Sequence, residues 1–472
     1  MTRTAAALLL VLACATAAAL ANPLHDAFSA PAGSVRAGVS KVDATMPIGV
    51  PLGGYNHGER RVPNWPLPIR TNYTYWMTPS VGHLDPTWAK ALVIDDGNTK
   101  FCFATIDAIG SEGDLRKMAY DNAVSRGFTV PYGQFILSAS HTHSGPAGIS
   151  SSFLFEAAPA MDLKVAALQE LMASHIADAL VQAEQNLAPA QFGIGVGQLV
   201  GVTRNRRANI SPYVTPTSID PNLGVVRVDD QNGKPIATVF NYAMHGTCYG
   251  PSNMNSSGDI PGASCNAVEQ AIGGVALFVN ADAGDIDPTG ESCQNFAGAV
   301  TIAQAVKSTR DSIVTATNIT IAAAYAEVNF GDTDMNITLA RFENCTSGGE
   351  LDICTICAVI GCEYNAHLGP FYIETVPAFA GVRFTVNNVH TLLATLPGEP
   401  LLELGWQVRN DSAALGFDQM ILAGYTNNHM GYFCTPNEYV IGGYESQLTL
   451  WGIDTAEKIR ASVKQVAAQV AP

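Results

Sequence analysis

The chain has 472 residues, a formal net charge of −16 and charged side chains at 14% of its positions. It contains no basic cluster that would neutralise phosphates, which argues against a nucleic-acid partner. An anionic membrane would repel the chain on average, so we expect peripheral membrane contact at most.

Residues 1–21 predict a secretory signal peptide. Arg3 precedes an apolar run from Ala5 to Leu20, and small residues end that run before Asn22. The run is too short and too rich in alanine to predict a transmembrane helix. We expect a mature chain of residues 22–472, built as one large domain or two tightly joined lobes. Its location would be extracellular or the lumen of a secretory compartment, the lysosome included.

Strand and helix patterns alternate along the first two-thirds of the chain. Apolar runs predict strands over residues 91–95, 101–107, 135–140, 237–244, 389–396 and 420–423. Apolar positions at steps of three and four residues predict helices over residues 112–122, 164–186, 262–272, 296–315 and 456–470. This order indicates an α/β fold in which mixed β-sheets are flanked by helices. Residues 340–376 interrupt the order, and we expect an irregular excursion tied by disulfides over one face.

The cysteines and sequons are typical of a secreted glycoprotein. Nine cysteines remain once Cys14 leaves with the signal peptide, and an odd number implies a free thiol or an intermolecular bond. Cys102, in a strand-like run, is the best candidate for a buried free thiol. A bridge between Cys248 and Cys434 would tie together two loops that follow predicted strands. Four clustered cysteines indicate two disulfides or, alternatively, a structural zinc site: Cys345, Cys354, Cys357 and Cys362. The sequons lie at Asn72, Asn209, Asn255, Asn318, Asn336, Asn344 and Asn410.

Candidate metal ligands follow four of the predicted strands. His141 and His245 come directly after strands, Glu399 follows residues 389–396, and Tyr432 lies just beyond residues 420–423. Ligand crevices in α/β sheets lie at the carboxyl ends of strands, so these side chains could converge on one zinc ion there. The alternative is that each is a hydrogen-bonded structural residue, because no pair forms a compact motif such as H-E-x-x-H.

Three aspartates also lie at strand ends or turns: Asp107, Asp259 and Asp285. We expect each of them to cap a turn by accepting backbone hydrogen bonds. The alternative is that one of them orients a zinc-binding histidine through its second ring nitrogen.

Four sequence blocks, in the same order along the chain, resemble the neutral (non-lysosomal) ceramidase family. They are Ser138-Ala-Ser-His-Thr-His-Ser-Gly-Pro146, Phe240-Asn-Tyr-Ala-Met-His-Gly-Thr247 with Ser257-Gly-Asp-Ile-Pro-Gly262, Leu396-Pro-Gly-Glu399, and residues 424–432 with 438–439 and 444–445. Weaker similarity near Gly38 and residues 53–55 extends the resemblance over almost the whole mature chain.

The resemblance implies a role for each matched residue. The family's zinc ligands correspond to His141, His245, Glu399 and Tyr432. His143 would lie beside the scissile amide, and Tyr444 would hydrogen-bond the reacting carbonyl. Arg206 would be the active-site arginine, although Arg204 and Arg207 are alternatives in the same short segment.

The chain departs from the family pattern at two points. In the block from Asn280 to Pro288, Asp287 stands where the family's amidases carry a serine held to be catalytic. Asp287 would then be a base or an orienting carboxylate, or else a turn residue before Pro288. The chain also stops soon after Trp451, so we expect the family's C-terminal immunoglobulin-like domain to be absent.

These features together predict a secreted, zinc-dependent hydrolase of linear amides that resembles neutral ceramidase. It would cleave a small-molecule or lipid amide with water activated by zinc, since zinc lowers the pKa of bound water to about 7. His143 would move the proton, and Arg206 and Tyr444 would stabilise the oxyanion. The alternatives are a zinc hydrolase of a different amide or ester and a non-catalytic, zinc-containing binding protein.

Overall fold

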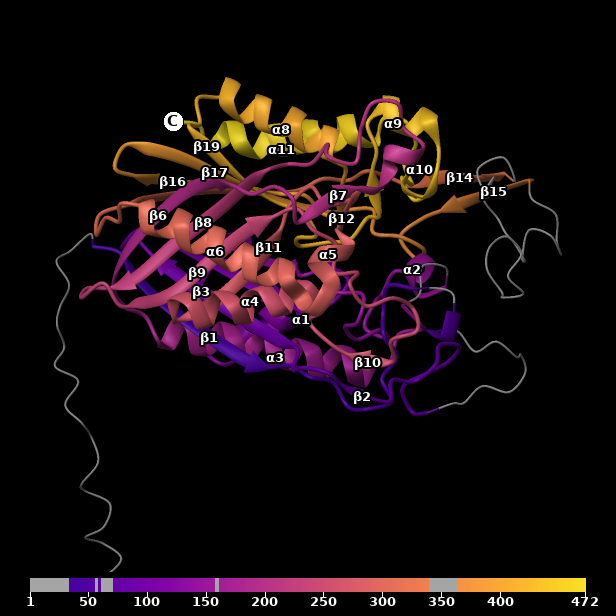
Figure 1. Cartoon of the computed structure of the whole chain (residues 1–472), viewed down its shortest axis with the longest axis horizontal. Helices are drawn as coiled ribbons and strands as arrows, with labels where there is room; N and C mark the ends of the chain where they lie inside the picture. Colours follow the sequence, from indigo (N-terminus) through magenta and orange to yellow (C-terminus); the bar gives the residue numbers. More distant parts are fainter. Residues whose placement is uncertain (1–33, 56–57, 61–70, 158–160, 339–362) are drawn as a thin grey trace, which may run out of the picture. The chain divides into compact units, whose positions relative to one another are not determined.

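The largest sheet has eight strands in the order β11-β9-β8-β6-β1-β3-β4-β5, and Figure 1 labels β1, β3, β6, β8, β9 and β11 among them. The computed structural model describes residues 34–55, 58–60, 71–157, 161–338 and 363–472. The sheet is mixed, because β4–β5 and β9–β11 are parallel pairs and the other neighbours are antiparallel. Its strands are β1 (Arg36–Asp43), β3 (Trp88–Asp95), β4 (Lys100–Ile106), β5 (Phe135–Ala139), β6 (Ala188–Gln198), β8 (Asn222–Asp230), β9 (Pro235–Tyr242) and β11 (Val275–Asn280).

A second, four-stranded sheet has the order β13-β16-β17-β19. Its strands are β13 (Thr320–Glu327), β16 (Ala378–Val386), β17 (Val389–Thr395) and β19 (Gln419–Ala423). One buried apolar cluster contains residues of both sheets, so the sheets pack face to face. Phe384 of β16 stacks on Phe103 and Phe192, with ring centroids 6.1 and 5.5 Å apart. Burying each such ring stabilises the fold by about 1.5–3 kcal/mol.

Helices cover the outer face of each sheet. Separate apolar clusters join α1 and α3 to β3 and β4, α4 and α6 to β8, β9 and β11, and α8 and α11 to the second sheet. The large sheet is therefore buried on both faces, which explains why β3 and β4 are almost continuously apolar. The helices are α1 (Gly113–Val124), α3 (Ala166–Gln185), α4 (Asp259–Ile272), α6 (Ala297–Ser312), α8 (Leu402–Ala414) and α11 (Thr455–Gln469).

Short elements connect these layers and carry most of the site described below. Four two-stranded pairs are β2 (Gly82–His83) with β10 (Asn255–Ser256), β7 (Thr203–Asn205) with β12 (Ile286–Pro288), β14 (Thr333–Thr338) with β15 (Glu363–Leu368), and β18 (Glu399–Pro400) with β20 (Tyr432–Phe433). The short helices are α2 (Phe153–Ala157), α5 (Gly290–Cys293), α9 (Pro436–Ile441) and α10 (Tyr444–Gln447). Single 3-10 turns occupy Gly58–Arg60, Tyr132–Gln134, Arg206–Asn209 and Gln294–Phe296.

The predicted strands and helices are confirmed, with ends that differ by a few residues. One prediction is wrong in part: residues 363–368 form strand β15 instead of irregular chain. The backbone of β15 pairs with the antiparallel strand β14. Met335 and Leu368 bury their side chains in the apolar cluster of the second sheet. The rest of the predicted excursion up to residue 362, with its four cysteines, lies outside the described residues, as does the predicted signal peptide.

The cysteine pairing differs from the sequence prediction. Cys248 bonds to Cys293 at the end of α5, so the predicted bridge to Cys434 is wrong. Cys434 lies buried as a free thiol, and so do Cys102, as predicted, and Cys265. The sequence could not reveal this pairing because it depends on how α5 packs beside the loop after β9. None of the described helices is both long and apolar enough to cross a lipid bilayer.

Candidate metal centre and active site

His141 lies two residues beyond the end of β5 in a left-handed backbone conformation, with φ of 62°. This conformation is uncommon for a residue with a Cβ and tends to persist at functional sites. The Nδ1 atom donates a hydrogen bond to the carbonyl of Ile109 at 2.6 Å. Because a carbonyl can only accept, this bond fixes the tautomer and leaves a lone pair on Nε2.

His245 follows β9, and its backbone N–H donates to the carbonyl of Ile286 in β12 at 2.9 Å. The side chain is fully buried, and neither ring nitrogen has a hydrogen-bond partner among the described residues. A buried polar atom left unpaired costs about 1–3 kcal/mol, so two such atoms on one ring call for an explanation. Coordination of a metal ion by the ring would supply one.

Glu399, in β18, brings a buried carboxylate against these imidazoles. Its Oε2 atom lies 3.3 Å from Nε2 of His141 and 3.4 Å from Nε2 of His245. A tetrahedral zinc ion with bonds of about 2.0–2.1 Å separates its ligand atoms by roughly 3.3–3.4 Å. These two separations match edges of a zinc coordination sphere, and the donor set of nitrogen and carboxylate oxygen is one that zinc accepts.

His143 and His429 flank this group. His143 Nε2 lies 3.2 Å from Nε2 of His141, and His429 Nε2 lies 3.3 Å from Oε1 of Glu399. Two overlapping sets of side chains could hold a metal: His141 with His143 and His245, and His141 with Glu399 and His429. The sequence analysis missed His429. The only signal was its place in the block between Gly424 and Tyr432, where nothing in the sequence marks which side chains turn inward.

The protonation states suit a cation. Burial lowers the pKa of His141 and of His143, and their mutual proximity lowers the pKa of His143 further. Burial raises the pKa of Glu399, but the neighbouring histidines outweigh burial and hold it well below its usual value. Neutral imidazoles beside an ionised carboxylate are the forms that metal binding requires.

Tyr432 joins the site through backbone pairing. It lies opposite Glu399 in the parallel β18–β20 pair, and its buried hydroxyl accepts a hydrogen bond from Nη2 of Arg206 at 3.1 Å. Burial raises the pKa of Tyr432 well above its usual value. The ring of Tyr444 packs 5.5 Å from the ring of Tyr432 and is 53% exposed, so it stands on the solvent side.

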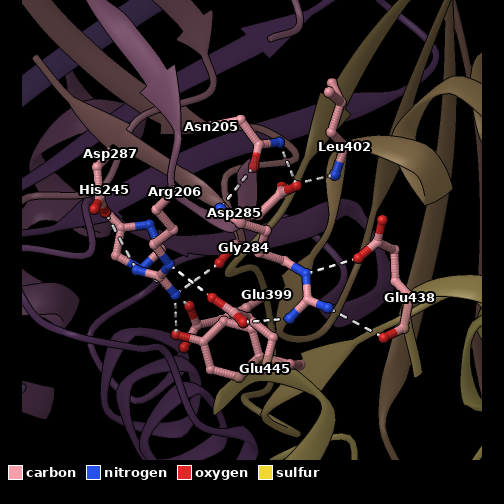
Figure 2. Close-up of polar contacts among 12 residues, drawn as sticks. Asn205, Arg206, His245, Gly284, Asp285, Asp287, Glu399, Leu402, Glu438 and Glu445 are labelled. Carbon is pink, nitrogen blue, oxygen red and sulfur yellow. Dashed lines mark hydrogen bonds and ion pairs between the residues drawn. The ribbon is translucent and has the colours of Figure 1, made fainter. Parts of the chain in front are cut away.

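Arg206 is the arginine of its segment that reaches the site (Figure 2). Besides Tyr432, it donates to the carbonyl of Gly284 at 2.8 Å, to Glu445 at 2.8 Å and to Asp287 at 3.2 Å. Burial lowers the pKa of Arg206, but Tyr432, Glu445 and Asp287 outweigh burial and raise it well above its usual value. Arg204 is exposed.

Asp287 lies in β12 with its side chain 22% exposed. Its carboxylate is held by Nη1 of Arg206, and its backbone pairs with Arg204 in β7. The predicted turn before Pro288 is thus a short strand. This ion pair places the carboxylate beside a residue that also binds Tyr432.

The other three aspartates accept backbone hydrogen bonds, but the donors to Asp107 and Asp285 lie in segments distant in sequence, so the expected capping of local turns is not what the structure shows for these two. Asp107 accepts from the N–H of Trp88, Asp259 from the N–H groups of Cys248 and Tyr249, and Asp285 from the N–H of Leu402. His141 is oriented by the carbonyl of Ile109 instead of by any of these carboxylates.

A pocket of about 600 Å³, part of it open to solvent, lies over the metal-type side chains. Its polar floor contains His141, His143, Glu399, His429 and Tyr432. Its walls are largely apolar and are formed by Ile109, Leu115, Ile149, Phe155, Met161 and Leu448. Such a pocket suits a ligand that combines a polar reacting group with an apolar chain.

Residues 73–371 match the family model described as neutral/alkaline non-lysosomal ceramidase, N-terminal. The neutral ceramidase of Mycobacterium tuberculosis is 23% identical over 390 residues, which cover 67% of this chain and 60% of that protein. Neutral ceramidase B of Dictyostelium discoideum is 29% identical over 182 residues, 34% of this chain and 24% of that protein. The chain thus matches less than two thirds of each relative's length.

The fold also matches a solved structure. The neutral ceramidase of Pseudomonas aeruginosa shares it with a TM-score of 0.72 and 18% sequence identity, over 93% of this chain and 74% of that one. The α/β architecture with mixed sheets and flanking helices is therefore confirmed.

Proposed function

Since the chain belongs to the neutral/alkaline non-lysosomal ceramidase family, we propose that it is a zinc-dependent hydrolase of an N-acyl lipid or a related amide. The observation that carries this proposal is that Oε2 of Glu399 lies at zinc-like separations from Nε2 of His141 and Nε2 of His245, beneath a pocket with apolar walls. The floor would hold the amide, and the walls would hold its acyl chain.

The proposed zinc ligands are His141, His245, Glu399 and Tyr432. The unpaired nitrogens of His245 and the contacts of Glu399 support the assignment. Zinc, when bound, polarises a carbonyl and lowers the pKa of bound water to about 7. The protein's part is to place the substrate and to manage protons and charge around it.

His143 is the proposed proton carrier, because its neutral imidazole lies at the same floor and faces the pocket. It would accept the proton of the attacking water and return it to the departing nitrogen. Arg206 and Tyr444 would stabilise the oxyanion that develops on the carbonyl. Arg206 carries a fixed positive charge, and Tyr444 reaches the pocket from its solvent side.

Asp287 is proposed to orient Arg206 and the attacking water, since its carboxylate is bound to that guanidinium. A serine nucleophile is not available at this position, so ceramide itself should be cleaved weakly or not at all. Hydrolysis of a shorter amide or of an ester should be detectable.

The experiment is a substrate panel run on the zinc-loaded protein. Ceramides of several chain lengths, short N-acyl amides and esters would be compared before and after removal of zinc by a chelator. Chelator-sensitive cleavage supports the proposal, and Asp287→Asn should then lower the rate because a neutral amide lacks the negative charge that binds the Arg206 guanidinium. Bound zinc without turnover of any substrate would favour a binding protein, and efficient release of fatty acid from ceramide would overturn the argument about Asp287.

The proposed location is the secretory pathway or the extracellular space. The disulfide between Cys248 and Cys293 supports an oxidising compartment. Among the asparagines whose exposure the structure describes, four in sequons are exposed and open to glycosylation: Asn72, Asn209, Asn318 and Asn410. A mobility shift after treatment of the protein from its native cells with an N-glycosidase would test this proposal.

A further inference from the structure

The Glu399 carboxylate is enclosed by three imidazoles, and each of its two oxygens faces at least one of them. Oε2 faces His141 and His245 at 3.3 and 3.4 Å, and Oε1 faces His429 at 3.3 Å. All four side chains are buried. The three contacts have nearly the same length although they come from three separate loops.

These lengths are those of ligand atoms around a metal. A charge-assisted hydrogen bond between a ring N–H and a carboxylate is about 2.7–2.9 Å long, whereas ligand atoms around zinc lie roughly 3.3–3.4 Å apart. The Nε2 atom of His429 is also buried, and in the part of the chain that the structure describes it makes no hydrogen bond. Nε2 of His429 is thus a third imidazole nitrogen that faces the Glu399 carboxylate at a distance too long for a charge-assisted hydrogen bond.

The surroundings of His429 hold its ring in this orientation. The ring of Phe155 packs against it edge to face, with centroids 4.9 Å apart. Gly110 lies beside it, and a Cβ atom at that position would come within 2.9 Å of His429 Cδ2. The ring therefore occupies a fitted slot, which a ligand needs in order to be held ready for a metal.

The two possible ligand sets describe one ion. Both include His141, and only its Nε2 atom can bind a metal because Nδ1 is committed to the Ile109 carbonyl. One nitrogen lone pair cannot serve two ions. His429 therefore belongs to the same centre as His141 and His245.

We propose that His429 is a third imidazole ligand of the metal, beside His141 and His245. This inference rests on the proposed function, since it assumes that the site holds zinc. It adds a ligand to the set of His141, His245, Glu399 and Tyr432. The resulting centre is richer in nitrogen and holds its ion more tightly.

X-ray absorption at the zinc edge counts imidazole ligands and tests the proposal directly. The zinc-loaded wild-type chain should show three imidazoles, and both His429→Ala and His429→Gln should show two. Competition with a chelator should give a rise in the zinc Kd of roughly 100-fold or more in both variants, above the 10- to 100-fold typical of residues that only support a ligand. His175→Gln, a histidine substitution within α3, is the matched control and should change neither quantity.

The glutamine variant separates a ligand from a hydrogen-bond donor. If His429 only positioned Glu399, His429→Gln would retain an N–H donor and would bind zinc as the wild type does, and this result would overturn the proposal. Circular dichroism of the metal-free variants checks that they fold. A wild-type chain that binds zinc with two imidazoles refutes the role of His429 alone, whereas a chain that binds no zinc refutes the proposed function as well.

Discussion

Two buried polar clusters lie side by side in this molecule and differ in how they are completed. Around Glu399, nitrogens of His143, His245 and His429 have no hydrogen-bond partner within the described residues. Around Arg207, the bonds close within the chain: the guanidinium donates to Glu438 at 2.8 Å, to Glu445 at 2.6 Å and to two backbone carbonyls. Figure 2 shows Glu445 as the link between them, since its other oxygen accepts from Arg206.

This difference in hydrogen bonding indicates that the Arg207 cluster is a structural framework and that the Glu399 cluster is a binding site. A cluster whose charges and donors are paired by the protein has nothing left for a ligand, and it serves to hold the chain in place. A cluster with buried nitrogens that lack hydrogen-bond partners is held in place by the surrounding packing. Binding of an ion to these nitrogens would stabilise the folded chain. Arg206 connects the two clusters. It donates to Glu445 of the Arg207 cluster and to Tyr432 beside Glu399.

The largest expected effect is on the framework. Arg207→Met leaves Glu438 and Glu445 buried without their guanidinium, so it should lower the free energy of unfolding by about 3–5 kcal/mol with or without zinc. Urea unfolding of the metal-free proteins measures this effect. Arg204→Met, at an exposed neighbouring position, should change stability by less than about 0.5 kcal/mol. A stable Arg207→Met variant would contradict the assignment of this cluster as framework.

His245→Ala should act on the binding site alone. His245 is one of five proposed ligands and would carry about a fifth of the roughly 10–16 kcal/mol that a zinc site gains, so the zinc Kd should rise by about 30- to 200-fold. Unfolding of the metal-free variant should stay close to that of the metal-free wild type, since the ring makes no hydrogen bond with the residues described. Chelator competition measures the first quantity, and zinc retained at full affinity would exclude His245 as a ligand.

Gly54→Ala should separate zinc binding from turnover. Gly54 has φ of 110°, and a Cβ atom would lie 2.5 Å from Cγ of His143, so the imidazole must move. A displacement of about 1 Å typically costs roughly 100-fold in rate, while the zinc content should remain. Gly127→Ala is the matched control, because its φ is 97° and nothing lies within 4 Å of the added carbon. Equal rates in the two variants would argue against a role for His143.

The smallest expected effect concerns a third cluster, in which one guanidinium serves two carboxylates. Arg409 binds Asp282 at 3.0 and 3.1 Å and also contacts Asp220. Burial and the Asp282 carboxylate raise the pKa of Asp220, although Arg409 opposes this shift. The folded chain therefore keeps a proton that the unfolded chain loses above pH of about 4.

Stability should then fall as pH rises from about 4 through the raised pKa of Asp220, because the folded state binds more protons than the unfolded state. Asp220→Asn removes this contribution, so its stability relative to the wild type should increase with pH by on the order of 1 kcal/mol. Thermal unfolding at pH 5 and pH 8 measures the change, and a relative stability that falls with pH would show that Asp220 is charged in the fold.

The sequence predicted the elements well because their apolar patterns are strong. Strands such as β3 and β4 are buried on both faces, and α3 repeats its apolar positions over 20 residues. The rule that ligands gather at the carboxyl ends of strands anticipated the positions of His141, His245, Glu399 and Tyr432, although their role as ligands stays a prediction. The resemblance to a family, not the pattern, singled out Arg206 and Tyr444.

The features that the sequence did not predict depend on backbone geometry, which cannot be deduced from residue types. Tyr425 and Asn427 adopt positive φ values of 53° and 72°, and these turns decide that His429 faces the pocket. The pairing of Cys248 with Cys293 depends on the position of α5, and β15 depends on a partner strand distant in sequence. Long-range contacts of this kind are set by tertiary packing and cannot be deduced from local periodicity.

The metal-type side chains come from strands of two different sheets. His141 and His245 follow β5 and β9 of the large sheet, whereas Glu399 and His429 follow β17 and β19 of the second. These loops contact each other at several points, for example where Thr426 bridges to Ser138 and Asn427 bonds to Leu137. Contacts so distant in sequence form late in folding. The proposed zinc site would therefore be complete only once both sheets have docked, so metal binding would follow the tertiary folding of the chain.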